Sequence, residues 1–255
     1  MSDQLSVEIN DFVAVMEIHG APNNYFNKSL VSEIAERGFE LDNDPNCRAI
    51  VLCSEGKHFC AGANFGDDSM EGDRTQTSSE LYRAAVRIFE IKTPMIAAVQ
   101  GSAVGGGLGL ACATDFRVAS PASRFVANFS LLGFHQGFGL SVSLPEIIGK
   151  QKSMDMLYSG RRVGGEEAFA IGLADRLVED GKQREEAIAW AKQIASAAPL
   201  AITSIRETLR DGLAERIRVV LERELDEQSW LWKTKDSQEG VAANLARRTA
   251  VFTGE

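Results

Sequence analysis

Residues 93–119, TPMIAAVQGSAVGGGLGLACATDFRVA, constrain the fold more than any other part of the chain. Residues 95–99 form a short apolar run behind a proline, which predicts a buried strand. Gly101 and the glycines at 105–107 predict a turn out of that strand, and residues 108–113 predict a helix of small residues. A strand, a glycine turn and a helix N-terminus in succession leave free backbone N–H groups pointing at one place. Such a place favours an oxygen that carries or develops negative charge.

Spacing excludes three familiar uses of a glycine turn. The phosphate-binding P-loop requires Lys-Ser or Lys-Thr after its last glycine, whereas Leu108 follows here. No three glycines have the dinucleotide-binding spacing, and Ser102 lacks the flanking glycines of a nucleophile elbow. Two interpretations stay open. In the first, the glycines at 105–107 let a ligand approach the backbone, which larger side chains would block. In the second, the glycines simply allow close packing of a buried helix.

Charge and composition narrow the class of ligand. The 255 residues are 44% hydrophobic and 25% charged, which is typical of a soluble globular protein. The formal net charge of -9 argues against nucleic acid as a partner, because phosphate affinity comes from basic residues. Apolar runs stop short of about 18 residues, and the N-terminus lacks a signal-peptide pattern, so we expect no membrane segment and a cytoplasmic location. A small-molecule substrate is the default expectation.

The four cysteines, Cys47, Cys53, Cys60 and Cys112, form no Cys-x-x-Cys pair and have no histidine at ligand spacing. This pattern predicts free thiols in a reducing compartment, and no metal site.

The rest of the chain alternates predicted strands and helices, which is typical of an α/β fold. We expect strands at 5–9, 12–18, 48–53, 116–119, 124–127 and 176–178. The first two strands could pair as a hairpin across Asn10-Asp11. One helix is expected to begin at Asn27 or Lys28, a second to cover 81–89 and a third to cover 166–171. From about Gln183 the pattern is helical only. The longest helix carries an apolar stripe, which predicts either core or a subunit interface; its members are Leu213, Ile217, Val220, Leu221 and Leu225.

A second loop repeats the pattern of the first. After the strand expected at 48–53 comes SEGKHFCAGANF, residues 54–65, where Ala61-Gly62 again follow a buried strand. Two strand ends that each offer a backbone N–H could aim at one carbonyl oxygen.

With both loops, the chain resembles the crotonase, or enoyl-CoA hydratase/isomerase, superfamily. The matching pieces are Pro22-Asn23-Asn24, GKHFCAGANF at 56–65, PMIAAVQGSAVGGGLGLACATDFRVAS at 94–120, RFVANFSLLGFHQGFG at 124–139 and SQEGVAANLARRTAVFTG at 237–254. The resemblance implies an α/β spiral of strand-strand-helix units over residues 1–195. It also implies a C-terminal helical region, 196–255, that forms a homotrimer and often a hexamer of two trimers. The implied substrate is an acyl group on coenzyme A, without a separate cofactor.

The resemblance also assigns site residues. The main-chain N–H groups of Ala61 and Gly106 would be the two oxyanion donors, which stabilise the enolate that forms when a thioester reacts at its alpha or beta carbon. The backbone at 57–64 would bind the adenine end. Cations for the coenzyme's phosphates, or simply solvated surface cations, are Lys57, Arg247 and Arg248. Further substrate contacts are expected from Ala63, Asn64, Phe65, Gly105, Phe129 and Gln136.

Departures from the family pattern fall on the acid and base. The two glutamates of family hydratases fall at Gly109 and Phe129, and an aspartate that some relatives use falls at Gly137. A general acid or base contributes about 10²- to 10⁴-fold, so efficient hydration by the usual route should be lost. His135 is the remaining acid or base candidate, with a structural role as the alternative. Phe129 in place of a carboxylate suggests a bulky or hydrophobic acyl group.

Three functions stay open. The first is a hydratase/isomerase-type enzyme that acts through an oxyanion-stabilised enolate with an unassigned base. The second is a decarboxylase or C–C bond hydrolase, in which bond cleavage itself generates the enolate. The third is a non-catalytic acyl-CoA-binding paralogue.

Overall fold

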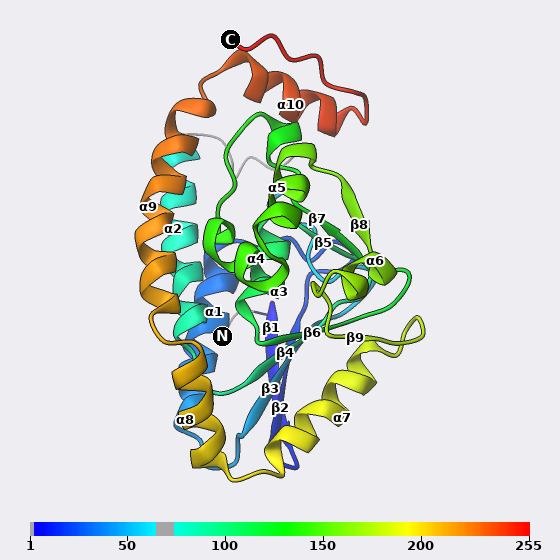
Figure 1. Cartoon of the computed structure of the whole chain (residues 1–255), viewed down its shortest axis with the longest axis vertical. Coiled ribbons are helices and arrows are strands. Elements are labelled where there is room, and N and C mark those ends of the chain that lie inside the picture. Colours follow the sequence, from blue (N-terminus) through cyan, green and yellow to red (C-terminus); the bar gives the residue numbers. More distant parts are fainter. Residues whose placement is uncertain (1–2, 65–73) are drawn as a thin grey trace.

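The computed structural model describes residues 3–64 and 74–255 of the chain. Within these ranges the strands form two sheets. The larger sheet contains β1 (Leu5–Asn10), β2 (Val13–Ile18), β3 (Ala49–Ser54), β4 (Met95–Ala98), β6 (Phe116–Ala119) and β9 (Arg176–Leu177). They lie in the order β1-β2-β3-β4-β6-β9, and all neighbours are parallel except the first pair. Figure 1 shows helices on both sides of this sheet, which confirms the predicted α/β class.

The smaller sheet contains β5 (Ser102–Val104), β7 (Arg124–Val126) and β8 (Arg162–Gly164). The middle strand, β7, is parallel to β5 and antiparallel to β8. Because β5 follows β4 after a short turn, the chain passes from the larger sheet to the smaller one just before the glycine run.

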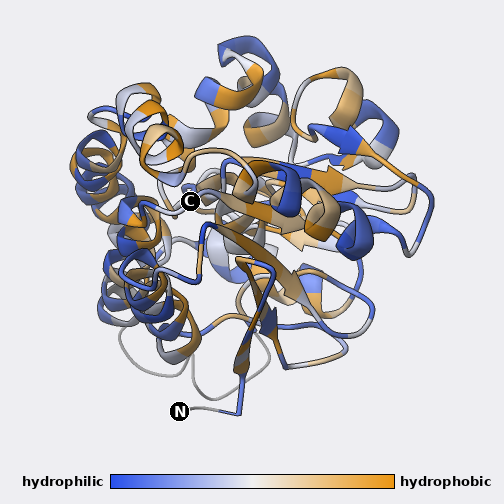
Figure 2. Cartoon of the chain, turned by 90° about the horizontal axis from the view of Figure 1, so that it is seen from below, coloured by the Kyte–Doolittle hydropathy of each residue, from blue (hydrophilic) through white to orange (hydrophobic). Residues whose placement is uncertain are grey.

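Alternating side chains of β3 divide the core into two layers. Ile50 and Leu52 belong to the larger cluster, which also holds buried residues of α1 (Lys28–Asp42), α2 (Arg74–Val86) and α3 (Gly106–Ala113). Val51 and Cys53 face the other side, where α7 (Gln183–Ala195) covers the sheet. The two-residue period of the strand therefore decides which face each side chain supplies. Figure 2 shows apolar residues gathered around the sheet and polar ones on the outer helix faces.

Short helices complete the first part of the chain: η2 (Arg87–Glu90), η3 (Ser130–Leu132), α4 (Leu140–Ile148), α5 (Lys150–Ser159) and α6 (Gly165–Ala170). The C-terminal part contains α8 (Pro199–Leu209), α9 (Leu213–Leu231) and α10 (Lys235–Leu245). Helix α9 packs along α2 and α4, and α10 packs on η3 (Figure 1).

The apolar stripe of α9 belongs to the core of its own chain. Leu213, Ile217, Leu221 and Leu225 are buried and Val220 is half-buried, so the core interpretation is confirmed for four of the five stripe residues. In contrast, α8 has no buried residue. It is fastened through Arg206 and Arg210, which both bind the Asp115 carboxylate, at 2.9 and 2.8 Å. Trimer or hexamer formation by this region stays a prediction.

Three local predictions were wrong. The first hairpin turns at Asp11 and Phe12, both at positive φ, rather than at Asn10-Asp11. Residues 102–104, expected as part of a turn, form β5, because they pair with β7. Residues 162–164, where the sequence predicted no strand, form β8 for the same reason. The conformation of such short strands depends on the strands with which they pair, and the local sequence pattern does not reveal that pairing.

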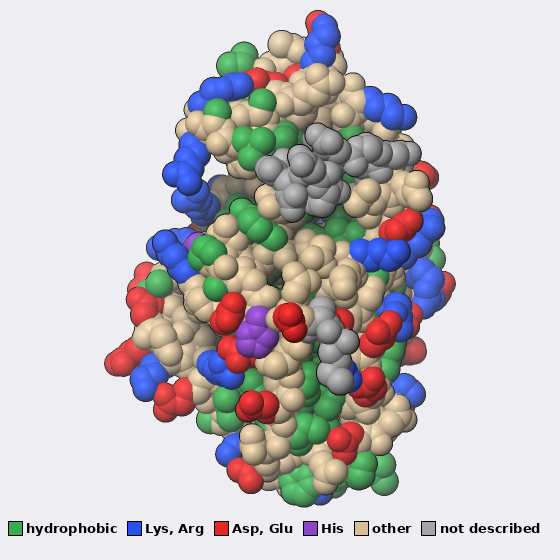
Figure 3. Space-filling model, turned by 180° about the vertical axis from the view of Figure 1, so that it is seen from behind, with side chains coloured by type: hydrophobic (Ala, Val, Ile, Leu, Met, Phe, Trp, Pro, Cys, Tyr) green, Lys and Arg blue, Asp and Glu red, His purple; other side chains and the backbone are tan. Residues whose placement is uncertain are grey.

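Charges of both signs lie side by side over the face shown in Figure 3, with apolar side chains between them. In the described part of the chain, no helix has the length and apolar character needed to cross a lipid bilayer.

Candidate active site

The two glycine-containing loops meet. Cys60 N–H donates to the Ser102 carbonyl, and Val104 N–H donates back to the Cys60 carbonyl, both at 3.0 Å. Gly62 approaches so closely that a Cβ there would lie 2.8 Å from the Val104 oxygen. The prediction that the two strand ends come together is therefore confirmed.

The three glycines of the run are needed for different reasons. Gly105 has φ of +54°, which L-residues rarely adopt, and its missing side chain faces Asn128 and Phe129 at ordinary contact distance. A Cβ on Gly106 would lie 2.2 Å from the Phe26 ring, and one on Gly107 would lie 2.2 Å from the Cys60 carbonyl. At these last two positions close packing excludes a side chain, as the second interpretation of the run predicted.

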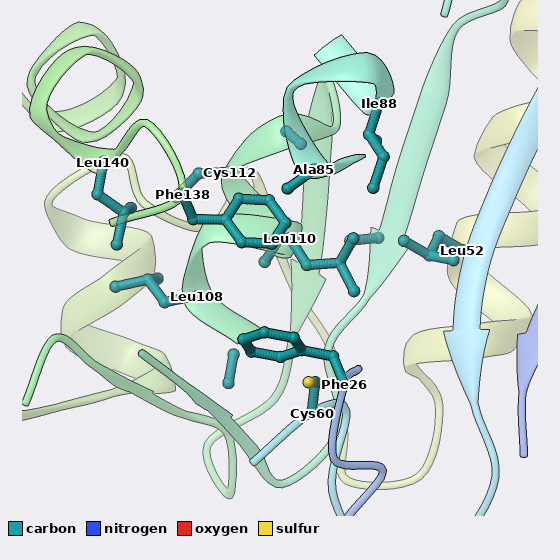
Figure 4. Close-up of a cluster of buried hydrophobic side chains, with 14 of the residues drawn as sticks. Phe26, Leu52, Cys60, Ala85, Ile88, Leu108, Leu110, Cys112, Phe138 and Leu140 are labelled. Atoms are coloured by element: carbon teal, nitrogen blue, oxygen red, sulfur yellow. The ribbon is translucent and has the colours of Figure 1, made fainter. Parts of the chain in front are cut away.

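Gly106 is the first residue of α3, and its N-cap residue, Gly105, offers no side chain to cap the helix. The first N–H groups of a helix lack intrahelical partners, so the Gly106 N–H is free to face a ligand. Figure 4 shows Phe26 and Cys60 packed together beside this helix.

The Ala61 N–H is not free. It donates to the Asn23 carbonyl at 2.9 Å, so the expectation that it serves as an oxyanion donor is wrong for this structure. The neighbouring Asn24 side chain fixes the same loop by donating to the carbonyls of Glu55 (2.8 Å) and His58 (2.5 Å). Among the described residues no acceptor is found for the Ala63 N–H, two residues further on. Ala63 is thus the better-placed donor in this loop.

Ala63 and Gly106 line one cavity of about 180 Å³. Its other lining residues are Tyr25, Phe26, Ala61, Gly62, Asn64, Tyr82, Val104, Gly105, Asn128, Phe129, Leu132, Phe134, Asn244 and Leu245. Of the predicted substrate contacts, the structure thus brings together Ala63, Asn64, Gly105 and Phe129. Within the described part of the chain, no carboxylate, histidine or cationic side chain lines this cavity.

Aromatic rings occupy the space where carboxylates were considered. A Cβ on Gly109 would lie 2.6 Å from the Phe138 Cβ, and one on Gly137 would lie 2.5 Å from the Tyr82 ring. In Figure 4 the Phe138 ring lies beside Leu110 and Ala85. Phe129 itself is buried and meets the Phe134 ring edge-on, with 5.9 Å between ring centres. These positions are therefore filled by packing against aromatic side chains.

Tyr82 of α2 is a site residue that the sequence did not indicate. Its ring is 6% exposed, and it packs edge-on against Phe138 at 6.3 Å. Burial raises the pKa of its phenol to about 12, although a hydrogen bond with the Gln228 side chain lowers it. A tyrosine within an amphipathic helix carries no local signal, because only the fold brings α2 to the glycine loops.

His135 and Gln136 lie elsewhere. Both line a separate cavity of about 560 Å³ with Tyr158 and Trp230, and neither lines the cavity at Gly106. The His135 Nδ1 bonds to the Gln136 carbonyl at 2.8 Å, and the Gln136 amide donates to the Ser141 hydroxyl at 2.9 Å. The structure therefore does not bring His135 to the site for which it was considered.

A larger cavity of about 660 Å³ adjoins the first, since Val104, Asn128, Leu132 and Asn244 line both. Its cations are Arg124, Arg162 and Arg248, with His58 nearby. Of the cations expected to bind phosphate, only Arg248 lines this cavity, and it pairs with Glu239 at 2.5 Å. Lys57 is exposed and Arg247 has φ of +54°, and neither lines either cavity. Phe65, expected as a substrate contact, lies outside the described residues, as do the acidic residues that follow it in the sequence, Asp67, Asp68 and Glu71.

Comparisons with known proteins identify the family of this chain. The sequence model "Enoyl-CoA hydratase/isomerase" matches residues 8–255. The chain is 29% identical over 255 residues to "Probable enoyl-CoA hydratase" of Bacillus subtilis, covering 98% of this chain and 99% of that one. It is 28% identical to "1,2-epoxyphenylacetyl-CoA isomerase" of Escherichia coli, over 91% of each chain.

A solved structure shows the same fold. The enoyl-CoA hydratase/isomerase from Pseudoalteromonas atlantica is 28% identical, with a TM-score of 0.88 over 98% of this chain and 100% of that one. This similarity confirms the predicted crotonase-like fold. The chain therefore belongs to the enoyl-CoA hydratase/isomerase family of enzymes, within the crotonase superfamily.

Proposed function

We propose that this enzyme binds an acyl-CoA thioester and stabilises its enolate with the backbone N–H groups of Ala63 and Gly106. The observation that carries the proposal is that these two residues line one cavity, one at a helix N-terminus and one with no acceptor among the described residues. Removing one such donor from an enzyme of known mechanism costs about 2.7–4 kcal/mol of transition-state stabilisation. The arginines of the adjoining cavity are the candidates for holding the coenzyme's phosphates.

The acyl group is proposed to be aromatic or similarly flat and apolar. Phe26, Phe129 and Phe134 line the cavity, whose 180 Å³ compares with the about 150 Å³ of an engineered cavity that binds benzene. Two of these rings, Phe129 and Phe134, already meet edge-on, which is a favoured aromatic geometry. The similarity to an epoxyphenylacetyl-CoA isomerase also favours an aromatic acyl group.

A second candidate reaction is decarboxylation or C–C bond cleavage of a thioester. It is favoured by the lack of any carboxylate or histidine among the described residues that line the cavity. When the bond that breaks leaves its electron pair on the alpha carbon, the enolate forms without a base, and the oxyanion donors alone lower the barrier.

The test compares two reactions of the purified protein. Crotonyl-CoA reports hydration, and malonyl-CoA reports decarboxylation. The proposed site binds both thioesters and hydrates crotonyl-CoA slowly or not at all. Fast hydration would contradict the carboxylate-free assignment of the cavity. Failure to bind any thioester would contradict the proposed function altogether. Decarboxylation of malonyl-CoA would select the second candidate, and its absence would remove that candidate for this acyl group.

A further inference from the structure

We propose that the Tyr82 hydroxyl is the acid of this site and delivers the proton to the alpha carbon of the enolate. The inference rests on the proposed function, because it needs the enolate that the Ala63 and Gly106 N–H groups would hold.

Tyr82 is selected by elimination among the groups that line the cavity. Of the described lining residues only the two tyrosines carry a proton that can be transferred, since the others offer amides, backbone groups or apolar surface. Tyr25 is 37% exposed, whereas Tyr82 is 6% exposed. An acid that protonates a carbanion has to be shielded, because bulk water would otherwise compete for the enolate.

Gln228 of α9 lies beside the Tyr82 phenol, and its hydrogen bond with that side chain lowers the pKa of the phenol. Gln228 is 1% exposed, and its Nε2 donates to the His135 carbonyl at 2.9 Å, which fixes the amide. The phenol therefore lies against a fixed polar neighbour.

The ring is held as firmly as its hydroxyl. Phe138 packs edge-on against one side, and a Cβ on Gly137 would lie 2.8 Å from the Tyr82 oxygen. Glycine at 137 therefore makes room for the hydroxyl at the position where some relatives were expected to place an aspartate. We infer that the phenol takes over the space, and with it the role, of that carboxyl group.

The proton transfer is balanced in atoms and electrons, and water is the only further reactant that it needs. The Tyr82 O–H bond breaks and its proton forms the new C–H bond at the alpha carbon, while the enolate electron pair becomes that bond. The thioester carbonyl is restored, and the electron pair of the O–H bond stays on the phenolate oxygen. A water molecule returns a proton to the phenolate after the product leaves. Because burial keeps the phenol protonated at neutral pH, the acid is ready before each turnover.

The test uses a pair of coenzyme A thioethers, one ending in a nitronate that mimics the enolate and one ending in a neutral alkyl group. Tyr82→Phe removes only the hydroxyl. We expect it to weaken nitronate binding by about tenfold or more, the size of a lost hydrogen bond to a charged group, with the neutral thioether unchanged. Tyr158→Phe is the matched control, because Tyr158 is 70% exposed and does not line the cavity.

The outcomes separate the two proposals. If the wild-type protein does not prefer the nitronate to the neutral thioether, the oxyanion proposal fails. If the wild type prefers it and Tyr82→Phe binds it equally well, Tyr82 is not the acid. A loss shared by both ligands would assign Tyr82 a structural role and would also overturn the inference. The wild type and Tyr82→Phe should unfold at similar temperatures, since the ring remains.

Discussion

Phe138 occupies the space beside Gly109, where a Cβ would lie 2.6 Å from the Phe138 Cβ and 2.6 Å from its ring. Both residues are buried, so neither can move into solvent. A glutamate side chain at position 109 would therefore clash with Phe138.

Gly109→Ala should therefore lower the free energy of unfolding by about 1–3 kcal/mol, the usual cost of overpacking a core. Gly164→Ala is the control, because its Cβ would meet only one atom within 4 Å, the Arg124 Nη1 at 3.9 Å. Urea denaturation measures both. Equal stability of the two variants would contradict the packing argument.

Phe129 lines the cavity that is proposed to hold the acyl group. Phe129→Ala should destabilise the protein by about 3–5 kcal/mol and raise kcat/KM for bulkier acyl groups relative to smaller ones. Phe169→Ala, at a side chain that is 49% exposed, should change neither the selectivity nor, beyond about 0.5 kcal/mol, the stability. Unchanged selectivity in Phe129→Ala would show that the acyl group lies elsewhere.

Asp115 fastens the C-terminal helices to the sheet. Its carboxylate accepts from the Met95 N–H at 2.8 Å and from Arg206 and Arg210. Asp115→Asn leaves two mostly buried guanidinium groups without their counter-charge, so we expect a loss of about 3–5 kcal/mol. Glu222→Gln, which breaks an exposed ion pair with Arg83, should cost at most about 1 kcal/mol in the same urea titration.

Glu224 makes stability depend on pH. Its carboxylate is buried and accepts from the N–H groups of Gly139 and Ser141, at 2.9 and 3.0 Å. Burial raises the pKa of Glu224, although these hydrogen bonds and the charge of His135 lower it. The Tyr82 phenol lies close to the same carboxylate. Because the folded-state pKa is raised, the group's stabilising contribution is complete below its unfolded pKa of about 4.3. The contribution is then lost as the pH rises through the folded value.

The wild type should thus lose stability relative to Glu224→Gln as the pH rises above about 4.3. Denaturation of both proteins between pH 4 and 8 gives the difference between their free energies of unfolding. The contributions of the other titratable groups cancel in this difference, because both proteins share them. A difference that is independent of pH would contradict the raised pKa.

The four cysteines should resist thiol reagents in the folded protein. All are buried and free, and burial raises the pKa of each thiol to about 12. Because the thiolate is the reactive form, native protein should react slowly with dithiobis(nitrobenzoate), and denatured protein should expose four thiols. Rapid labelling of the native protein would show that a cysteine lies in a site that opens.

Much of the fold could be predicted because its signals are local. The runs of β2, β3 and β4 are apolar, and the stripe of α9 repeats at helical spacing, so period and length identify them. β5 and β8 could not be predicted, since three residues carry no period and owe their conformation to pairing with β7.

The site was predictable only in outline. Two glycine loops at strand ends indicated where an oxygen would bind, and the structure shows that Gly106 lines a cavity between these loops. The choice between Ala61 and Ala63 depends on which N–H the Asn23 carbonyl takes, and that hydrogen bond spans residues far apart in sequence. Tyr82 was missed for the same reason, because its role arises only where α2 meets α9 and the loop at Gly137.

The backbone N–H groups of Ala63 and Gly106 are proposed to polarise a thioester carbonyl. This polarisation can be measured as the ¹³C chemical shift of a thioester labelled at its carbonyl carbon, bound to the wild-type protein and free in solution. Two hydrogen bonds to the oxygen draw electron density from the carbon, so we expect a downfield shift on binding. The amide resonances of Ala63 and Gly106 should move at the same time. A bound carbonyl at its free chemical shift would show that these N–H groups do not polarise it.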